Sequence, residues 1–505
     1  MPQDKVMDKQ LSPKARDLIA NPSCYIDGLR EVGGGYEITK LNPATGLVLG
    51  SYPTASSDQV DRALKAARRA HDDALWSGTS PKERSDMLHA LAALIERDYD
   101  LLMEIVVADV GTPVSFAAPM QLDGALLNFK WFADAARVGP DGWYERGTGI
   151  DQPDVGITSA GILVREPIGV VGAITAYNFP YTLMAWKLGA ALAAGCSVVM
   201  QPSPRSTLSS MALFRLIEEL PLPKGVVNFV IGEADVGRQI SSAPEVDLVS
   251  FTGSVAVGAS VAEQAAPGIK RVVLELGGKS PNVLLPNSDI EAAIAPSIQR
   301  LVTNAGQRCG ATSRIIVHED DLERFKVAAQ AYLSEIVIGD PTDSNTLVGP
   351  LIDERHKAAV QAHLDRALAD GATIVAQAPP LSPALAGGAY LAPMILGGLA
   401  NEHPFCQEEQ FGPVGVVLTY RDVDEAVAIA NASEFGLNAS VFGPTVDAMA
   451  VARRIRAGTV GINGGGRIRP DAPWGGFRHS GVGREAGNEG FREFFEIKHI
   501  QWPVR

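Results

Sequence analysis

Short apolar segments alternate with helix-like segments between residues 170 and 276, and this alternation constrains the fold more than any other feature of the chain. The apolar segments cover residues 170–176, 197–200, 226–230, 248–252 and 272–276. Helical periodicity fills the intervals at 180–194, 207–220, 235–241 and 256–265. Strands that are continuously apolar and joined by helices form a parallel sheet covered on both faces. We therefore expect a doubly wound α/β domain that binds its ligand beyond the carboxyl ends of the strands.

A second alternating α/β region follows at 277–476, with strand-like segments at 314–317, 372–375 and 414–419. Residues 144–165 predict an extended hairpin, and residues 491–504 predict the end of a helix followed by a strand. A chain of 505 residues is long enough for two large domains or three smaller ones.

The N-terminal part carries local start signals for two helices. Ser56 with Gln59, and Ser80 with Glu83, each match a capping box, and the second has proline at the first helical position. Residues 36–52 predict a short antiparallel strand pair around a turn. Residues 1–35 lack such patterns, so we expect a loose arm there.

Charge and cysteine content exclude several classes of function. The net charge of −14 and a pI near 5.1 argue against binding to nucleic acid or to an anionic membrane surface. The four cysteines form no C-x-x-C pair and no zinc-like cluster with histidine, so we expect free thiols, no metal and a cytoplasmic location. The N-terminus lacks the pattern of a secretory signal. The apolar stretch at 183–200 contains Lys187 and Gly195, which favours a buried helix and strand over a membrane span.

Two glycine-flanked residues carry the strongest chemical signal. Cys309 lies within Gly306-Gln-Arg-Cys-Gly310, and Glu275 lies within Leu274-Glu-Leu-Gly-Gly278. A thiolate attacks carbonyl carbon, and a carboxylate activates water. Taken alone, the cysteine is more often a small buried hydrophobe and the glutamate more often a surface charge.

The two segments resemble the signature segments of the aldehyde dehydrogenase superfamily, and the resemblance extends over about residues 36–500. It implies that Cys309 is the nucleophile and Glu275 the general base. The segment Ala176-Tyr-Asn-Phe-Pro180 is similar to the Pro-Trp-Asn-Phe-Pro stretch of the family, which makes Asn178 the oxyanion donor. The implied reaction oxidises an aldehyde to an acid through a thioester on Cys309, which water then hydrolyses.

The resemblance also implies an architecture. An NAD(P)-binding domain would comprise 1–140 and 166–276, and a catalytic domain 277–476. Residues 141–165 and 477–505 would form an oligomerisation element, in a homodimer or homotetramer.

A cofactor site is expected where Phe251-Thr-Gly-Ser254 ends a strand and opens a helix. The spacing of Gly253 and Gly258 differs from the usual dinucleotide fingerprint, but a helix N-terminus after a strand suits a pyrophosphate. The resemblance implies NAD, with contacts from Thr175, Gln201, Ser203, Gly253, Ser254, Leu276, Glu409 and Phe411.

The chain departs from the family at the adenosine ribose. Gln201-Pro-Ser-Pro204 stands where the family usually has Lys-Pro-Ser-Glu. The charged lysine is absent, Pro204 replaces the glutamate that repels a 2′-phosphate, and Arg205 is a nearby cation. NAD is favoured, and NADP stays open.

The substrate pocket implied by the resemblance is apolar and aromatic, with Phe179, Trp186, Ile468 and Trp474 beside Arg308. These aromatic residues are equally compatible with ordinary core packing. Arg467 or Arg469 could bind a carboxylate on the substrate, although exposed arginines are the commoner interpretation.

Two rival functions stay open. The first is a catalytically silent protein on the same fold, which would be expected to lack Cys309 or Glu275. The second is an acylating dehydrogenase that passes the acyl group to coenzyme A, and the presence of Glu275 favours hydrolysis over it.

Overall fold

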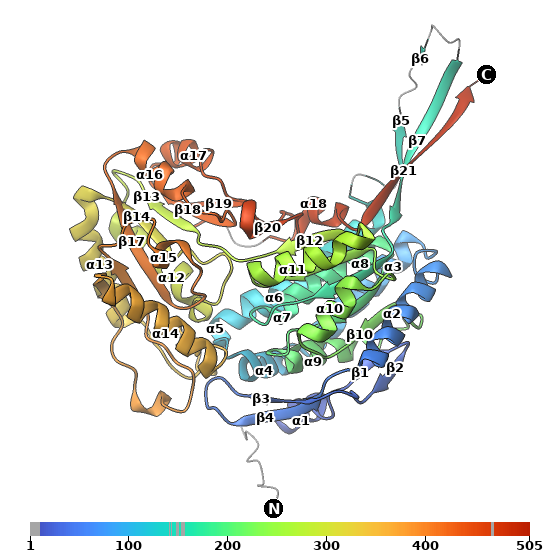
Figure 1. Cartoon of the computed structure of the whole chain (residues 1–505), viewed down its shortest axis with the longest axis horizontal. Coiled ribbons are helices and arrows are strands. Elements are labelled where there is room, and N and C mark those ends of the chain that lie inside the picture. Colours follow the sequence, from blue (N-terminus) through green and yellow to red (C-terminus); the bar gives the residue numbers. More distant parts are fainter. Residues whose placement is uncertain are drawn as a thin grey trace, which may run out of the picture.

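The computed structural model describes residues 11–140, 142, 144–147, 151–152, 157–465 and 469–504. Two α/β bodies lie side by side, and a narrow arm of antiparallel strands projects from one of them (Figure 1). This arrangement confirms the mixed α/β class with parallel sheets.

The first body is built on an eight-stranded sheet with the order β2-β1-β10-β9-β8-β11-β12-β20. Its strands are β1 (Cys24–Ile26), β2 (Leu29–Glu31), β8 (Val170–Ile174), β9 (Ser197–Gln201), β10 (Val227–Phe229), β11 (Leu248–Thr252), β12 (Arg271–Glu275) and β20 (Gly481–Val482). The five strands from β10 to β12 are parallel, and the predicted strands of this region are confirmed. Chain order reverses between β8 and β11, which is where a doubly wound sheet opens a crevice for a ligand.

Helices cover both faces of this sheet (Figure 1). They are α1 (Pro13–Ile19), α2 (Ser57–Asp72), α3 (Pro81–Arg97), α4 (Tyr99–Val110), α5 (Val114–Ala117), α6 (Asp123–Val138), α7 (Pro180–Met184), α8 (Ala190–Ala194), α9 (Thr207–Ile217), α10 (Ala234–Ser242), α11 (Val255–Ala265) and α18 (Gly487–Arg492). The segment at 180–194 is buried as expected, with a π-helical turn at Ala185–Gly189 between α7 and α8. None of the helices in the described part of the chain is long and apolar enough to cross a membrane.

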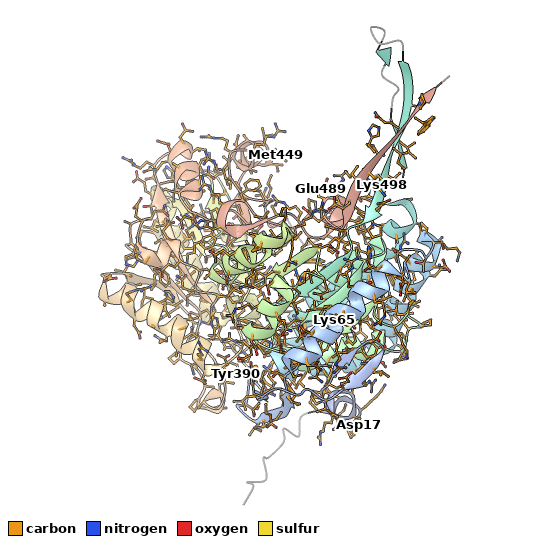
Figure 2. All side chains as sticks on the ribbon, turned by 45° about the vertical axis from the view of Figure 1, so that its right-hand side comes forward. Asp17, Lys65, Tyr390, Met449, Glu489 and Lys498 are labelled. Carbon is orange, nitrogen blue, oxygen red and sulfur yellow. The ribbon has the colours of Figure 1, made fainter. Side chains whose placement is uncertain are left out.

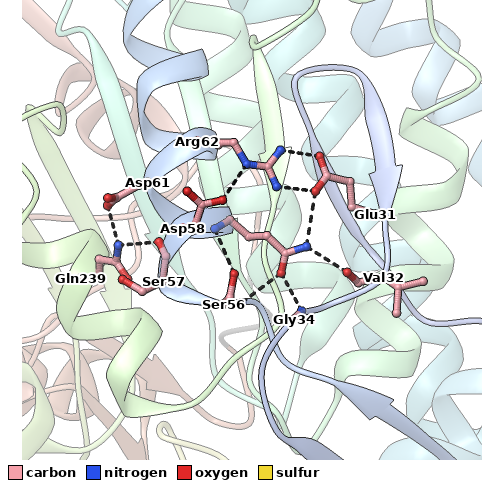
Figure 3. Close-up of polar contacts among 10 residues, drawn as sticks. Glu31, Val32, Gly34, Ser56, Ser57, Asp58, Asp61, Arg62 and Gln239 are labelled. Carbon is pink, nitrogen blue, oxygen red and sulfur yellow. Dashed lines mark hydrogen bonds and ion pairs between the residues drawn. The ribbon is translucent and has the colours of Figure 1, made fainter.

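The N-terminal residues are ordered, so the expectation of a loose arm is wrong for the residues that the structure describes. Both predicted capping boxes form, and the one at Ser56 also holds the preceding chain (Figure 3). The side chain of Gln59 accepts from Gly34 N at 2.8 Å and donates to Val32 O at 2.9 Å. Arg62 forms a bidentate ion pair with Glu31 at 2.6 and 2.5 Å, which lowers the pKa of Glu31. These contacts are made between segments distant in sequence, which a local pattern does not reveal.

The second body is built on a seven-stranded sheet with the order β15-β16-β17-β14-β13-β18-β19. Its strands are β13 (Pro281–Leu284), β14 (Arg314–His318), β15 (Thr373–Gln377), β16 (Met394–Gly397), β17 (Val414–Tyr420), β18 (Asn438–Phe442) and β19 (Thr459–Ile462). The helices are α12 (Ile290–Val302), α13 (Leu322–Glu335), α14 (Glu354–Ala369), α15 (Pro404–Gln407), α16 (Val423–Asn431) and α17 (Thr445–Ala452). A separate hydrophobic core fills this body.

The arm joins distant parts of the chain. Its strands are β5 (Tyr144–Gly147), β6 (Asp151–Gln152), β7 (Ile157–Pro167) and β21 (Phe495–Val504). β21 pairs with β7 antiparallel along its whole length, and Lys498 forms an ion pair with Glu166 at the base of the arm (Figure 2). The predicted C-terminal strand and hairpin are confirmed. A further small sheet pairs β3 (Glu37–Leu41) with β4 (Val48–Pro53), also as predicted.

Candidate active site

A cavity of about 1020 Å³ lies at the carboxyl ends of β8, β9, β11 and β12, where the second body closes over it. It brings together predicted residues from distant parts of the chain. Those that line it are Thr175, Asn178, Phe179, Trp186, Gln201, Ser203, Gly253, Ser254, Glu275, Leu276, Cys309, Glu409, Phe411 and Trp474.

The remaining predictions concern the substrate side. Arg308 does not line this cavity. Its guanidinium lies over the Phe116 ring at 5.3 Å and donates to Thr303 Oγ1 at 2.7 Å. Ile468 and Arg467 lie outside the described residues. Arg469 forms an exposed ion pair with Asp471 at 2.6 Å.

Cys309 lies in the loop between α12 and β14, beside an apolar and aromatic cluster that includes Phe179, Trp186 and Trp474. The pKa of the Cys309 thiol is raised to about 12, mainly by burial and in smaller part by the nearby Glu275 and Glu409. The Arg308 guanidinium acts in the opposite direction. The thiol is therefore protonated at neutral pH in the absence of a bound ligand.

A network of hydrogen bonds holds the loop that carries Cys309. Asn178 Nδ2 donates to Gln307 O at 3.0 Å, which leaves its second amide hydrogen for a ligand. Gln307 Oε1 accepts from Tyr177 Oη at 3.1 Å and from Ile352 N at 2.9 Å. Asn304 donates to the carbonyls of Asn178 and Gln307.

The turn before Cys309 has an unusual backbone. Asn304 and Ala305 adopt left-handed conformations with φ of 55° and 52°. For residues other than glycine this conformation costs of order 1–3 kcal/mol, so the surrounding network must hold it. Thr112 supports the turn by donating to Asn304 Oδ1 at 2.8 Å.

Glu275 ends β12 and is only 3% exposed. Neither of its carboxylate oxygens has a hydrogen-bond partner within the part of the chain that the structure describes. Burial raises the pKa of Glu275 well above its usual range, and the neighbouring Glu485 carboxylate raises it further. Burial therefore favours the neutral form of Glu275, and no hydrogen bond from the described residues holds its carboxyl group in one orientation.

A buried polar cluster lies next to Glu275. Lys187 Nζ pairs with Glu485 and donates to Ser250 Oγ at 3.0 Å. The second oxygen of Glu485 has no hydrogen-bond partner among the described residues. Neither Lys187 nor Glu485 was predicted from the sequence as a site residue. A lysine inside an apolar helix requires a buried counter-charge. The position of Lys187 in such a helix is the sequence signal that could have identified it.

The other end of the cavity suits an anionic, hydroxyl-rich ligand. α11 begins after Ser254 with no side-chain cap and no acidic residue in its first turn, so its first N–H groups face the cavity unblocked. The buried hydroxyls of Thr175 and Thr252 have no partner within the described ranges. These orphaned donors and acceptors fit a dinucleotide.

Glu409 is held at the junction of the two bodies. Its Oε1 accepts from Gly278 N at 3.0 Å, and a Cβ on Gly277 would lie 2.3 Å from its Oε2. A side chain at 277 would therefore displace the Glu409 carboxylate from this position. Burial raises the pKa of Glu409 to about 7. Phe411 lies nearby, with its ring edge-to-face against Tyr177 at 6.0 Å.

The departure at Gln201 has a structural consequence. Gln201 Nε2 donates to the carbonyls of Gly232 and Glu233 at 2.9 and 2.7 Å. Arg205 pairs with Asp353 at 3.4 Å and lies over the Tyr177 ring at 5.5 Å. Tyr177, which replaces the tryptophan of the resembled segment, thus contacts Arg205 as well as Gln307 and Phe411. As for metals, no group of three metal-ligating side chains occurs within the described ranges.

Comparisons with known proteins agree with this geometry. The model of the aldehyde dehydrogenase family matches residues 32–500. A 3-succinoylsemialdehyde-pyridine dehydrogenase of Pseudomonas sp. is 37% identical over 480 residues, which are 94% of this chain and 97% of that protein.

Two solved structures are similar over nearly the whole chain. A betaine aldehyde dehydrogenase of Staphylococcus aureus in complex with NAD+ has a TM-score of 0.92 at 33% identity, covering 97% of this chain and 96% of that one. A mutant of aldehyde dehydrogenase C of Pseudomonas syringae, in complex with NAD+ and octanal, has a TM-score of 0.89 at 35% identity, covering 97% of both chains. Because a family model matches almost the entire length and relatives above 30% identity cover it, this chain belongs to the aldehyde dehydrogenase family, and its reaction is the oxidation of an aldehyde.

Proposed function

We propose that the protein oxidises an aldehyde to a carboxylic acid with NAD, through a covalent intermediate on Cys309. The observation that carries the proposal is the presence of Cys309, Glu275 and Asn178 around one cavity whose far end suits a dinucleotide. The NAD complexes of the two similar structures support this cofactor. When bound, the nicotinamide ring accepts the hydride that aldehyde oxidation releases.

The first step is attack of the Cys309 sulfur on the aldehyde carbon, after the thiol proton has passed to water. Arg308 favours the thiolate, because its positive charge lowers the thiol pKa. The C=O electron pair moves to oxygen, and the alkoxide accepts hydrogen bonds from the free amide hydrogen of Asn178 and from the Cys309 N–H. Preorganised donors of this kind are typically worth about 100- to 1,000-fold in rate.

Loss of hydride from the tetrahedral intermediate leaves a thioester on Cys309. Glu275, once deprotonated, takes a proton from water, and the water oxygen attacks the thioester carbon. The C–S bond breaks, the acid leaves and Cys309 is regenerated. The raised pKa of Glu275 makes it a stronger base than an exposed carboxylate, which suits this step.

The lining of the cavity supports a set of cofactor contacts. Gly253 and Ser254, at the N-terminus of α11, would hold the pyrophosphate. Glu409, Phe411 and Leu276 would hold the nicotinamide half, and Thr175, Gln201 and Ser203 would hold the adenosine half. The corresponding domains are 1–140 with 166–276 for the cofactor and 277–476 for catalysis.

We propose an apolar or aromatic aldehyde as substrate. Phe179, Trp186 and Trp474 form the wall beside Cys309, and the two tryptophan rings lie 6.3 Å apart. The indole N–H of Trp186 is buried without an acceptor in the described part of the chain, so it is available to a substrate oxygen or nitrogen.

We also propose that residues 141–165 and 477–505 mediate assembly into a homodimer or homotetramer. β21 is an edge strand of the arm, and its side chains Ile497, Ile500 and Trp502 are exposed. An exposed apolar edge of this kind is typical of a surface that another chain covers. β20 also belongs to residues 477–505, but it pairs with β12 of the first body and not with the arm.

The test is a panel of aldehydes assayed for NAD reduction with wild type and Cys309→Ala, with product identified with and without coenzyme A. We expect a free acid, formed only by the wild type. An acyl-coenzyme A product would overturn the hydrolytic step, and equal activity of both proteins would overturn Cys309 as nucleophile.

A further inference from the structure

One short segment of the cavity wall, residues 409–412, contacts two different parts of the site. At its first residue, Glu409 lines the cavity and accepts from Gly278 N. At its last residue, the carbonyl oxygen of Gly412 packs so closely against Gly306 that a Cβ there has no room. Gly306 belongs to the loop that carries Cys309. The segment therefore joins a proposed cofactor contact to the loop of the proposed nucleophile.

The middle of this segment has a strained backbone. Phe411 adopts a left-handed conformation with φ of 55°. Such a conformation is an outlier for a bulky residue, and it persists only where surrounding contacts hold it. The ring of Phe411 packs against Tyr177, but this contact does not fix the backbone. The peptide groups of Phe411 therefore need a partner of their own.

His356 is that partner. Its Nε2 lies 2.8 Å from the carbonyl oxygen of Phe411, and the two rings meet at 65° with centroids 6.2 Å apart. A carbonyl oxygen only accepts, so Nε2 carries the hydrogen. Burial lowers the pKa of His356, so the ring is neutral at neutral pH and keeps its single hydrogen on Nε2. No other donor to this carbonyl occurs in the described part of the chain.

The first turns of α14 hold His356 against the segment. Asp353, the N-cap of α14, accepts from His356 N at 2.7 Å. Val360 lies four residues after His356 and therefore on the same face of the helix. It packs against Gly412, where a Cβ would lie 2.7 Å from Val360 Cγ1. One face of α14 thus contacts two successive residues of the segment.

We infer that His356 is a positioning residue for the reaction: its hydrogen bond to Phe411 O holds residues 409–412 so that Glu409 and the Cys309 loop keep one mutual position. The inference rests on the proposed use of NAD and of Cys309. His356 acts through the backbone of the segment and not on the reacting atoms. Loss of its hydrogen bond should therefore impair two steps together, which are NAD binding through Glu409 and thioester formation through the loop.

The experiment compares two amides at position 356 in the full-length protein. In His356→Gln the amide nitrogen lies about as far along the side chain as Nε2, so it can donate to Phe411 O. In His356→Asn the same group is one methylene shorter and cannot reach. The dissociation constant of NAD is measured by quenching of tryptophan fluorescence. The rate constant of the burst of reduced cofactor is measured at saturating NAD by rapid mixing.

We expect His356→Gln to stay within about twofold of wild type in both quantities. His356→Asn should bind NAD about three- to tenfold more weakly and form the thioester about three- to tenfold more slowly, as loss of one hydrogen bond implies. His356→Leu has no donor and should match His356→Asn. Gln361→Asn makes the same shortening on the exposed surface of α14 and should leave both quantities unchanged.

Each outcome discriminates. Equal impairment of His356→Gln and His356→Asn, or wild-type values in both, would overturn the inference while leaving the proposed function intact. Weaker NAD binding in His356→Asn with an unchanged burst rate at saturating NAD would confine His356 to the cofactor side, and this result would also overturn the inference. Absence of both NAD binding and a burst in the wild type would contradict the proposed function itself.

Discussion

Cys309 and Glu275 border the same cavity, yet the protein holds them in opposite ways. The loop of Cys309 is bound by the amides of Asn178, Asn304 and Gln307, which hold a strained turn in place. Glu275 has a buried carboxyl with no hydrogen-bond partner in the described ranges. Cys309, the proposed nucleophile, is thus held in position, whereas no hydrogen bond holds the carboxyl group of Glu275, the proposed base, and burial raises its pKa.

This difference matches the demands on the two groups. A nucleophile must meet the aldehyde carbon in one geometry, and small misplacement reduces the rate strongly. A base that acts on water after the cofactor has been reduced must reach a different position. An unbonded carboxyl can rotate, because no hydrogen bond has to be broken.

The largest effect is expected for Cys309→Ala, which removes the covalent step. Turnover should fall at least about a thousandfold, because removal of a nucleophile typically costs more than that. The dissociation constant of NAD should stay within a few-fold of wild type. Turnover is measured by cofactor reduction, and the dissociation constant is measured by fluorescence titration. Substantial remaining turnover would show that the fixed loop does not carry the nucleophile.

Glu275→Gln tests the role of the carboxyl group that no hydrogen bond holds. Steady-state turnover should fall about 100- to 10,000-fold, the usual contribution of a general base. A burst of reduced cofactor close to one equivalent per chain should remain, because Cys309 still forms the thioester. Rapid-mixing kinetics separate the two phases, and loss of the burst would mean that Glu275 also acts before acylation.

Asn178→Ala tests whether Asn178 both holds the Cys309 loop, through Gln307 O, and donates to the oxyanion. We expect a loss of about 100- to 1,000-fold in kcat/KM from the missing donor. Asn178→Asp keeps the size but removes the amide hydrogens, so it should be equally impaired. Full activity in the aspartate variant would mean that turnover needs neither the bond from Asn178 Nδ2 to Gln307 O nor an oxyanion contact from this amide.

The pH dependence of thiol alkylation tests how strongly burial disfavours the thiolate form of Cys309. Since burial raises the pKa of Cys309 to about 12, the thiolate fraction lies far below saturation at neutral pH. In the apoenzyme, the rate of alkylation by iodoacetamide should rise up to about tenfold per pH unit between about pH 7 and pH 10. A plateau below about pH 8 would show that the thiolate is already formed at neutral pH.

Tyr177→Phe should produce the smallest effect. It deletes one hydrogen bond to Gln307 Oε1 and leaves the ring packed against Phe411. Gln307 keeps its bond from Ile352 N, so we expect a loss of only a few-fold in kcat/KM. The burst rate should fall by the same factor, which identifies loop positioning. An effect on NAD binding alone would place the role of Tyr177 at the cofactor.

Some of the site was predictable because it depends on local sequence. The glycine-flanked segments around Cys309 and Glu275, the helix start after Ser254 and the capping boxes are all encoded within a few consecutive residues. Lys187, Glu485 and Tyr177 were not named as site residues, because their roles depend on partners 63 to 298 positions away. The ordered residues 11–35 were missed for the same reason, since they are held by α2 and by the edge of the sheet.

The sequence by itself determined the fold class and the alternation of strands and helices, because both follow from periodicity, which is a local property. Through its resemblance to a family it also predicted Cys309 as nucleophile and Glu275 as base. Only the tertiary structure decided how the groups are held and charged. The pKa values of Cys309 and Glu275 depend on burial, the direction of Gln201 depends on two distant carbonyls, and the cavity exists only where the two bodies meet.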